Sequence, residues 1–221
     1  MGGTTEGEMR MDRLTGCGFV AIWNDVSRGT EEDFFAWHAD EHMPERLAIP
    51  GFLRGMRWGH EGATPRYFTL YILSGSEVAR SADYMARLNA PTPWTQRVMS
   101  SFRDNARCVG EFTSSLGDGP GQGVVILRLE GPLAAELPEA IMKIDGVSGC
   151  HLGMSDAATS ALATVERQGR TVTEPQGLLI VCLAPQAQAA SVAKALSEIL
   201  PQDTADAMMV LMLQLDRRQS Q

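Results

Sequence analysis

The sequence lacks the features that mark several large functional classes. It has no cluster of Lys and Arg, and its formal net charge is −8 with a pI near 5.0. Nucleic acids and anionic membrane surfaces attract concentrated positive charge, so we expect neither as a partner. The longest apolar runs, 177–184 and 207–215, are strand-length and too short to cross a bilayer as helices.

Cysteine is scarce and widely spaced. Cys17, Cys108, Cys150 and Cys182 form no C-x-x-C pair, whereas zinc ribbons and thioredoxin-like sites need close pairs. A disulfide scaffold would be denser, so we expect buried, reduced thiols. No basic segment followed by an apolar one opens the chain, as in a cleaved secretion signal, and we predict a cytoplasmic protein.

Phosphate-binding and nucleophile motifs are also missing. No G-x-G-x-x-G or G-K-[S/T] stands between a strand and a helix, and no nucleophilic Ser or Cys motif is found. A nucleotide cofactor therefore has no support in the sequence. We predict that the protein works without a cofactor.

Residues 37–58, WHADEHMPERLAIPGFLRGMRW, are the most informative stretch that is present. Its aromatic, His and Glu side chains recur at three- and four-residue steps, which predicts a helix. Pro50 and Gly51 end that helix, and residues 52–60 then alternate with the period of a strand. A helix with titratable groups thus leads directly into a strand with Arg and Trp.

This segment resembles the helix-to-strand signature of EthD-like proteins, in which a Trp, a short charged spacer, His-x-Pro and Pro-Gly precede a strand. EthD-like proteins belong to the dimeric α+β barrel superfamily of ferredoxin-like domains. The matching residues are Trp37, Glu41, His42, Pro44, Arg46, Leu47, Pro50, Gly51 and Phe52. The resemblance covers this segment alone, and it implies an α+β barrel with a histidine that faces a cavity.

The order of predicted elements supports that fold. We predict a first set of strands at 18–26, 52–60, 66–74 and 107–114, with helices at 30–47, 76–88 and 94–105. A second set has strands at 124–129, 147–153, 178–184 and 208–216, with helices at 133–143 and 186–200. Both sets follow the βαββαβ order of a ferredoxin-like unit. The second also contains extra polar sequence at 155–174, where we expect a helix at 157–168.

We therefore predict an α+β protein of two tandem ferredoxin-like units whose antiparallel sheets face each other as a pseudo-dimeric α+β barrel. The predicted domains are a mobile tail (1–15), a first repeat (16–116), a Gly-rich linker (117–123) and a diverged second repeat (124–221). A ferredoxin-like sheet has helices on one face only, so its other face needs a partner, which the second half can supply. A homodimer through the outer edges stays open.

His42 is the candidate catalytic acid or base, because imidazole titrates near neutral pH and this one precedes Pro44. The alternative is a structural His that packs near the helix end. Glu41 is a second catalytic candidate, which would orient His42; otherwise it belongs to a charged outer face. Alignment of the halves on Gly51 and Gly146 places Leu137 opposite His42, so we expect one site.

The ligand-binding candidates come from the strands. Tyr67, Thr69 and Tyr71 alternate with an apolar set at 68, 70 and 72. We expect the apolar set under the helices and the Tyr/Thr set inside the barrel. Arg54, Trp58 and His151 are predicted to join them there. Such an interior would bind a mostly apolar small molecule with an anionic end, held by Arg54; alternatively, side chains simply fill it.

A zinc site is a third alternative, because His38 and His42 are four residues apart on one helix. The sequence H-A-D-E-H differs from H-E-x-x-H, however, and the spacing indicates no third ligand apart from His60. We therefore predict no metal site.

The leading functional hypothesis is a cofactor-independent enzyme that moves a proton on an aromatic or lactone-like compound. Isomerase, lyase and oxygenase-like chemistry all stay open, because a fold does not choose among them. The alternative is a non-catalytic, small-ligand-binding or stress-associated barrel protein.

Overall fold

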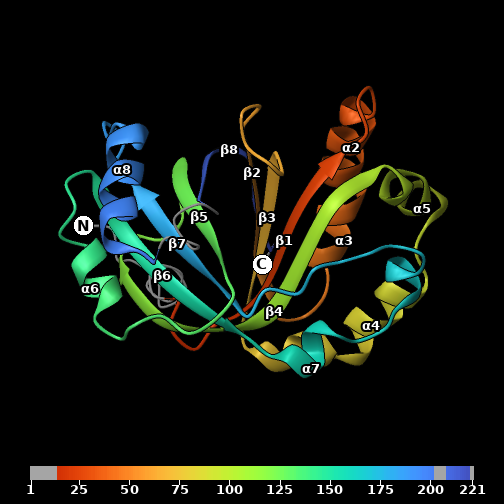
Figure 1. Cartoon of the computed structure of the whole chain (residues 1–221). Helices are drawn as coiled ribbons and strands as arrows, with labels where there is room; N and C mark the ends of the chain where they lie inside the picture. Colours follow the sequence, from red (N-terminus) through yellow and green to blue (C-terminus); the bar gives the residue numbers. More distant parts are fainter. Residues whose placement is uncertain (1–13, 202–207, 220–221) are drawn as a thin grey trace, which may run out of the picture.

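The computed structural model describes residues 14–201 and 208–219. Eight antiparallel strands close into a barrel in the order β1-β3-β2-β8-β5-β7-β6-β4. The strands are β1 Gly18–Val26, β2 Phe52–Gly59, β3 Tyr67–Leu73, β4 Phe102–Gly117, β5 Gly123–Leu129, β6 Val147–Ser155, β7 Gly177–Leu183 and β8 Met209–Arg218. β4 is long enough to pair with β1 along one part and with β6 along another, and Figure 1 shows it crossing the bottom of the barrel.

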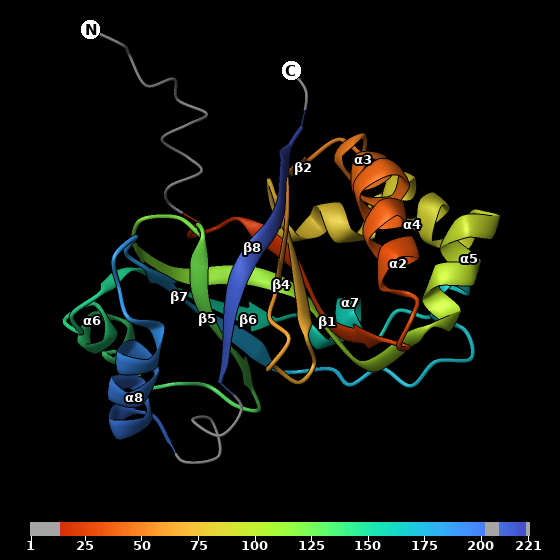
Figure 2. The same ribbon diagram turned by 90° about the horizontal axis from the view of Figure 1, so that it is seen from above.

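Helices pack against the outside of this barrel. The first half contributes α2 Glu31–Trp37, η1 His38–His42, α3 Met43–Leu47, η2 Ser76–Arg80, α4 Ala82–Asn89 and α5 Pro93–Ser100. The second half contributes α6 Leu137–Ile141, α7 Ala157–Ser160, η3 Val165–Arg167 and α8 Ala189–Ile199. Figures 1 and 2 show α2 to α5 on one side and α6 and α8 on the opposite side.

The predicted α+β class and the closed antiparallel barrel are confirmed. Within each half the strand order is β4-β1-β3-β2 and β8-β5-β7-β6, and the halves join through β2–β8 and β4–β6 pairing. That the halves are two copies of one ferredoxin-like unit stays a prediction.

The barrel interior is filled by side chains. Phe68, Leu70 and Ile72 point into one core cluster with residues of the other strands, among them Trp23 and Trp58. The predicted face assignment on β3 is therefore wrong, because the Tyr/Thr set lies on the outer, helix-covered face. Both faces of the sheet are buried here, so the alternation of polarity could not distinguish them.

Three predicted boundaries also need correction. β4 begins at Phe102, so the helix predicted at 94–105 ends at Ser100. The predicted tail reached residue 15, but Leu14 is fully buried in the barrel core; residues 1–13 lie outside the described part. The helix predicted at 157–168 is reduced to α7 and η3.

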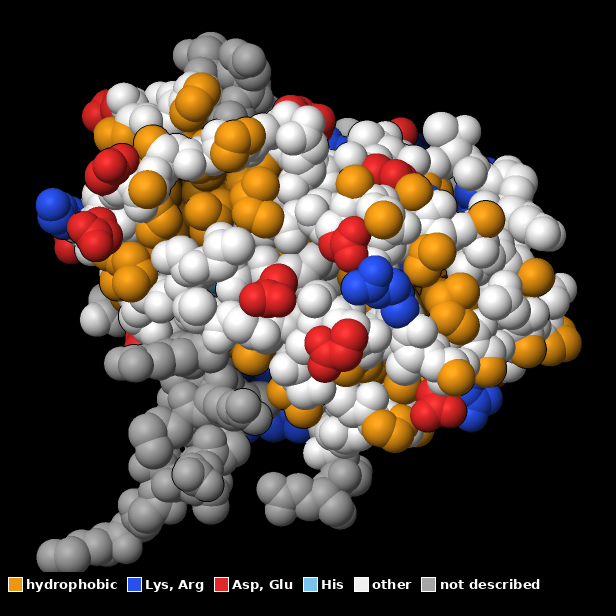
Figure 3. All heavy atoms as spheres, turned by 90° about the horizontal axis from the view of Figure 1, so that it is seen from below, with side chains coloured by type: hydrophobic (Ala, Val, Ile, Leu, Met, Phe, Trp, Pro, Cys, Tyr) orange, Lys and Arg blue, Asp and Glu red, His pale blue; other side chains and the backbone are white. Residues whose placement is uncertain are grey.

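The thiols are buried, as expected from the sequence, and the surface carries dispersed charges. All four cysteines are buried, and burial raises the pKa of Cys108 and of Cys150 to about 12. Among the residues described, no helix is both long and apolar enough to span a membrane. Seen from below, charged side chains are dispersed, and apolar ones gather on the left (Figure 3), the side of α6 and α8 in Figure 1.

Candidate active site

The helix that carries the histidines contains a π-turn. α2, η1 and α3 run on without interruption, and the N–H of Met43 donates to the carbonyl of His38, five residues back. Pro44 has no N–H, and its ring would press on the carbonyl four residues earlier in a regular helix. The wider turn avoids that clash, and π-turns are frequent at functional sites. His38 and His42, both on this turn, are buried.

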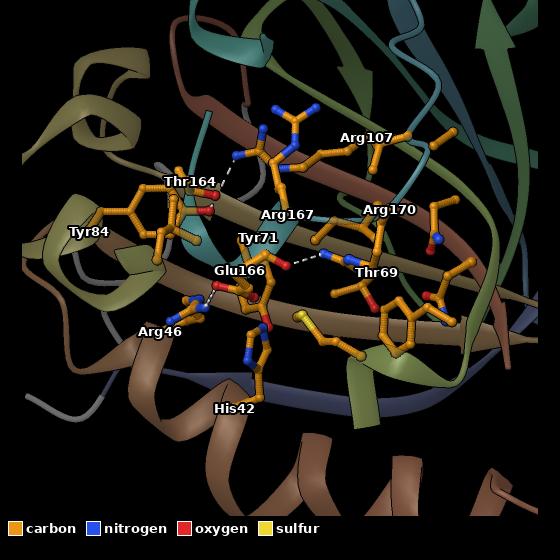
Figure 4. Close-up of a pocket in the computed structure, with 18 of the residues that line it drawn as sticks. His42, Arg46, Thr69, Tyr71, Tyr84, Arg107, Thr164, Glu166, Arg167 and Arg170 are labelled. Atoms are coloured by element: carbon orange, nitrogen blue, oxygen red, sulfur yellow. Dashed lines mark hydrogen bonds and ion pairs between the residues drawn. The ribbon is translucent and has the colours of Figure 1, made fainter. Parts of the chain in front are cut away.

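A cavity lies between this helix, α4, α5 and the outer face of the barrel sheet (Figure 4). Residues 157–172, which we call the covering segment, reach across from the second half and form one of its walls. Its volume is about 70 Å³, several times the roughly 10–15 Å³ that one buried water needs. The cavity can therefore hold a few waters or a compact ligand.

His42 is a neutral imidazole in the wall of this cavity. Its ring packs on Trp37 with centroids 4.3 Å apart. Burial, followed by the positive charge of Arg46, holds the pKa of His42 well below 6.5. Nδ1 has no hydrogen-bond partner within the described residues. At pH 7 the neutral ring thus has a nitrogen that no described residue engages.

A second buried histidine gives the cavity a directed hydrogen-bond donor. Burial lowers the pKa of Arg57 to about 10, so this guanidinium stays charged at pH 7 and can only donate. It donates to Nδ1 of His38 at 2.9 Å, which places the proton of neutral His38 on Nε2, 3.2 Å from the Tyr71 hydroxyl. Tyr71 therefore accepts from His38 and keeps its own O–H to donate, and it lines the cavity.

Positive charge dominates the cavity lining. Four arginines, Arg46, Arg107, Arg167 and Arg170, face a single carboxylate, that of Glu166. Arg46 donates to Glu166 at 2.7 Å, and this pair connects α3 to the covering segment. A net positive lining within a protein of charge −8 favours an anionic ligand group.

The lining also contains polar atoms without partners. In the described part of the chain, the lining residues with a buried, unpartnered side-chain atom are His42 (Nδ1), Arg46 (Nη1), Asn105 (Oδ1), Thr164 (Oγ1) and Arg170 (Nε). Buried polar atoms are nearly always hydrogen-bonded in folded proteins. Their concentration around one cavity indicates a place for water or a polar ligand, between apolar walls that include Phe34, Trp37 and Phe102.

Three predicted site residues come together here. His42, Thr69 and Tyr71 all line the cavity. Tyr67 packs beside it against Phe34 and is not in the lining. The site therefore lies outside the barrel wall, and the ligand position predicted inside the barrel is corrected accordingly.

The structure does not bring Glu41 or Arg54 to this cavity. The Glu41 carboxylate accepts from the hydroxyls of Thr92 and Thr95, which ties the π-turn to α5. Arg54 makes two hydrogen bonds with Asp216 of β8, at 2.8 and 2.6 Å. Both groups therefore have structural partners away from the cavity.

Trp58 and His151 also lie elsewhere. Trp58 is packed in the barrel interior, and its Nε1 donates to the carbonyl of Gly121. Both ring nitrogens of His151 are occupied, Nδ1 by Ser115 and Nε2 by the carbonyl of Asp118. The interior that was predicted to bind a ligand is thus a packed core.

The main cations of the cavity were not predicted from the sequence. Arg46 is part of the EthD-like segment, but nothing in its spacing distinguishes it from a charge on an outer helix face. Arg167 and Arg170 belong to the extra polar sequence at 155–174, which the first half lacks. The presence of this insertion was the one available signal of a functional segment. Nothing in its own residue pattern shows that it folds over the other half.

The geometry is unfavourable to a two-histidine metal site. Both nitrogens of His38 are engaged by Arg57 and Tyr71. Across the part of the chain with assigned structure, no three His, Cys, Asp or Glu side chains are grouped to hold a metal ion.

The sequence matches no protein-family profile and no curated protein. Solved structures are nevertheless similar in fold. An anthrone oxidase-like protein has a TM-score of 0.57 at 9% identity, over 93% of this chain and 94% of the other. A candidate monooxygenase from Fusobacterium nucleatum subsp. nucleatum has a TM-score of 0.51 at 8% identity, over 92% and 95%.

A candidate chlorite dismutase has a TM-score of 0.52 at 10% identity, over 91% of this chain and 96% of the other. At such identities the similarity establishes the fold alone, a closed antiparallel barrel with helices outside it.

Proposed function

We propose that the protein is a small-molecule enzyme of the dimeric α+β barrel type that performs acid/base proton transfer, without a cofactor, on an aromatic or lactone-like compound. One observation carries the proposal. A neutral histidine with an unpartnered nitrogen and a buried arginine with an unpartnered N–H line the same cavity. A base and a fixed cation in a dry site are what proton abstraction next to a carbonyl needs.

In the proposed step, His42 takes a proton from a carbon or hydroxyl acid of the substrate. The electron pair of the broken bond moves onto the substrate oxygen as an enolate or phenolate. The Tyr71 O–H is the donor to this oxygen, and the positive charge of Arg46 in the same cavity stabilises it. The imidazolium then returns its proton to the same or a neighbouring atom, which leaves the enzyme unchanged.

Three further observations support the proposal. Aromatic side chains form much of the cavity wall, which suits a flat apolar body. The cavity volume of about 70 Å³ leaves little room for a nucleotide beside a substrate, since sites for drug-sized ligands span roughly 300–1,000 Å³. The names of the similar structures, an oxidase-like protein, a monooxygenase and a chlorite dismutase, are all names of small-molecule enzymes.

We also propose that residues 16–116 and 124–221 are tandem ferredoxin-like repeats, one of which kept the site. Gly51 and Gly146 support this, with φ of +92° and +87° at equivalent turns. The Gly51 carbonyl accepts from the N–H of Ser74, just after β3. The Gly146 carbonyl accepts from the N–H of Ala184, just after β7. In this interpretation the second half takes the place of a second subunit in closing the barrel.

Hydrogen exchange at carbon tests the proposal whatever the final product of the reaction is. Aromatic acids, phenols and lactones would be incubated with the protein in D2O, and deuterium uptake followed by mass spectrometry. We expect exchange with one compound class, and a loss on the order of 10²–10⁴-fold in His42→Gln. His60→Gln is the matched control, because His60 is exposed on the β2–β3 turn.

Two results would contradict the proposal. One is deuterium uptake in His42→Gln at the wild-type rate. The other is a compound that native mass spectrometry shows bound while it exchanges no proton and stays unchanged; that result would favour the non-catalytic binding protein.

A further inference from the structure

The ion pair between Arg46 and Glu166 is incomplete. Both side chains are almost fully buried, at 4% and 6% exposure, and Nη2 of Arg46 lies 2.7 Å from Oε2 of Glu166. Nη1 of Arg46 has no hydrogen-bond partner among the described residues, and the Glu45 carboxylate is 4.0 Å away. A guanidinium binds a carboxylate best through two parallel N–H groups, and Glu166 engages only one.

Glu166 comes from a segment that makes polar contacts both within the second half and with the first half. The N–H of Val165 donates to Oδ1 of Asn89, and Ser160 bonds with Val109. Arg167 pairs with Glu174 at 2.7 Å, and Arg170 donates to the carbonyl of Glu166 itself. Within the described residues, the pair with Arg46 is the one ion pair that joins the covering segment to the first half. Loss of this pair would free the Glu166 side chain and leave the Arg167–Glu174 pair and the Arg170 bond in place.

An outer groove lies on the far side of Glu166. Its volume is about 690 Å³, and it runs between α5, the start of β4 and the covering segment. It shares five lining residues with the cavity, namely Met99, Phe102, Asn105, Glu166 and Arg170. A ligand that enters through this groove meets Glu166 before it reaches Arg46.

We propose that Glu166 occupies the anion-binding position of the cavity in the ligand-free protein and that the carboxylate of a small aromatic acid displaces it. The inference deepens the proposed function by naming the ligand class and rests on it for the location of the site. The incoming carboxylate fills both N–H groups of Arg46, and its ring lies against the aromatic wall. Glu166 then moves out toward the groove with the covering segment.

Calorimetric titration with benzoate tests this inference, with benzamide as the uncharged analogue. Glu166→Gln removes the competing carboxylate, so we expect it to bind benzoate at least about ten-fold more tightly than the wild type, a gain of about 1.4 kcal/mol. Glu174→Gln is the matched control in the same region, since its carboxylate pairs with Arg167, and it should bind benzoate as the wild type does. Benzamide should not distinguish the proteins.

The double variant Arg46→Met/Glu166→Gln carries neither charge, so it avoids an unpaired buried guanidinium, and it should lose the gain. Equal or weaker benzoate binding by Glu166→Gln, no binding to any of the proteins, or a gain that survives in the double variant would overturn the inference.

Limited trypsin digestion provides a second measurement on the wild-type protein. Arg167 and Arg170 are potential cleavage sites in the covering segment, where their side chains are now engaged. Displacement of Glu166 by benzoate should accelerate cleavage there, whereas protection by benzoate would overturn the inference. Neither measurement requires turnover. If His42→Gln took up deuterium into the substrate at the wild-type rate, the proposed chemistry would be refuted, but the benzoate and trypsin results would be unaffected.

Discussion

His151 should make the stability of the protein fall steeply in mild acid. Its ring is fully buried, with Nε2 donating to the carbonyl of Asp118 and Nδ1 accepting from the hydroxyl of Ser115. Burial lowers the pKa of His151 to about 4, although the contacts with Asp118 oppose this shift. The folded protein thus holds the ring neutral where the unfolded chain binds a proton.

The sign and size of the effect follow from linkage. Between pH 6.5 and pH 4 the unfolded state binds more protons, so the free energy of unfolding falls as the pH falls. Each pH unit in this window costs about 1.4 kcal/mol, so the full window from 6.5 to about 4 costs about 3 kcal/mol. This is a large part of the roughly 5–15 kcal/mol that stabilises a typical domain.

The assay is urea unfolding followed by tryptophan fluorescence from pH 7 down to pH 4, for the wild type and His151→Gln. Gln keeps an N–H for Asp118 and an oxygen for Ser115 but does not titrate. The stability advantage of the wild type over this variant should shrink by about 3 kcal/mol across the range. Parallel curves would refute the reasoning. His60→Gln, at an exposed histidine, is the control and should follow the wild type.

Other predictions concern the cavity and the barrel. Arg46→Met should lower the free energy of unfolding in urea by about 3–5 kcal/mol, because it leaves the buried Glu166 carboxylate unpaired. The double variant Arg46→Met/Glu166→Met should recover most of that loss, and equal losses in the two variants would contradict this. Gly110→Ala should lose about 1–3 kcal/mol, because a Cβ would overlap the carbonyl of Met154, whereas Gly131→Ala, with open space, should not lose stability. The low pKa of His42 keeps its base form as pH falls from 7 through 6.5, so deuterium uptake should stay level there; a decline centred near 6.5 would contradict the assignment.

Local patterns predicted most of the elements. Alternation located β1, β2 and β3 within a residue or two of their observed ends, and Pro50-Gly51 marked the end of the His42 helix. The His-x-Pro motif pointed to a residue that does line a cavity. These predictions succeeded because turns, helix ends and strand periods depend on residues close together in the chain.

The face assignments failed for a different reason. The sequence showed that Tyr71 and its neighbours alternate, but both faces of this sheet are buried, one in the barrel and the other under helices. A hydrophobic pattern distinguishes a buried face of a strand from a solvent-exposed face. It does not distinguish between two buried faces. Arg54 was misplaced too, because its partner, Asp216, is 162 residues away.

The sequence alone thus determined the fold class, the order of the strands along the chain and a helix with His42 beside a proline, since each follows from short-range periodicity and backbone chemistry. The tertiary structure decided where the cavity lies and which charges enter it. Arg46 meets Glu166 across 120 residues, and His38 acquires its tautomer only when β2 brings Arg57 against it. Contacts of this kind depend on how the two halves close around each other, and no local pattern encodes that geometry.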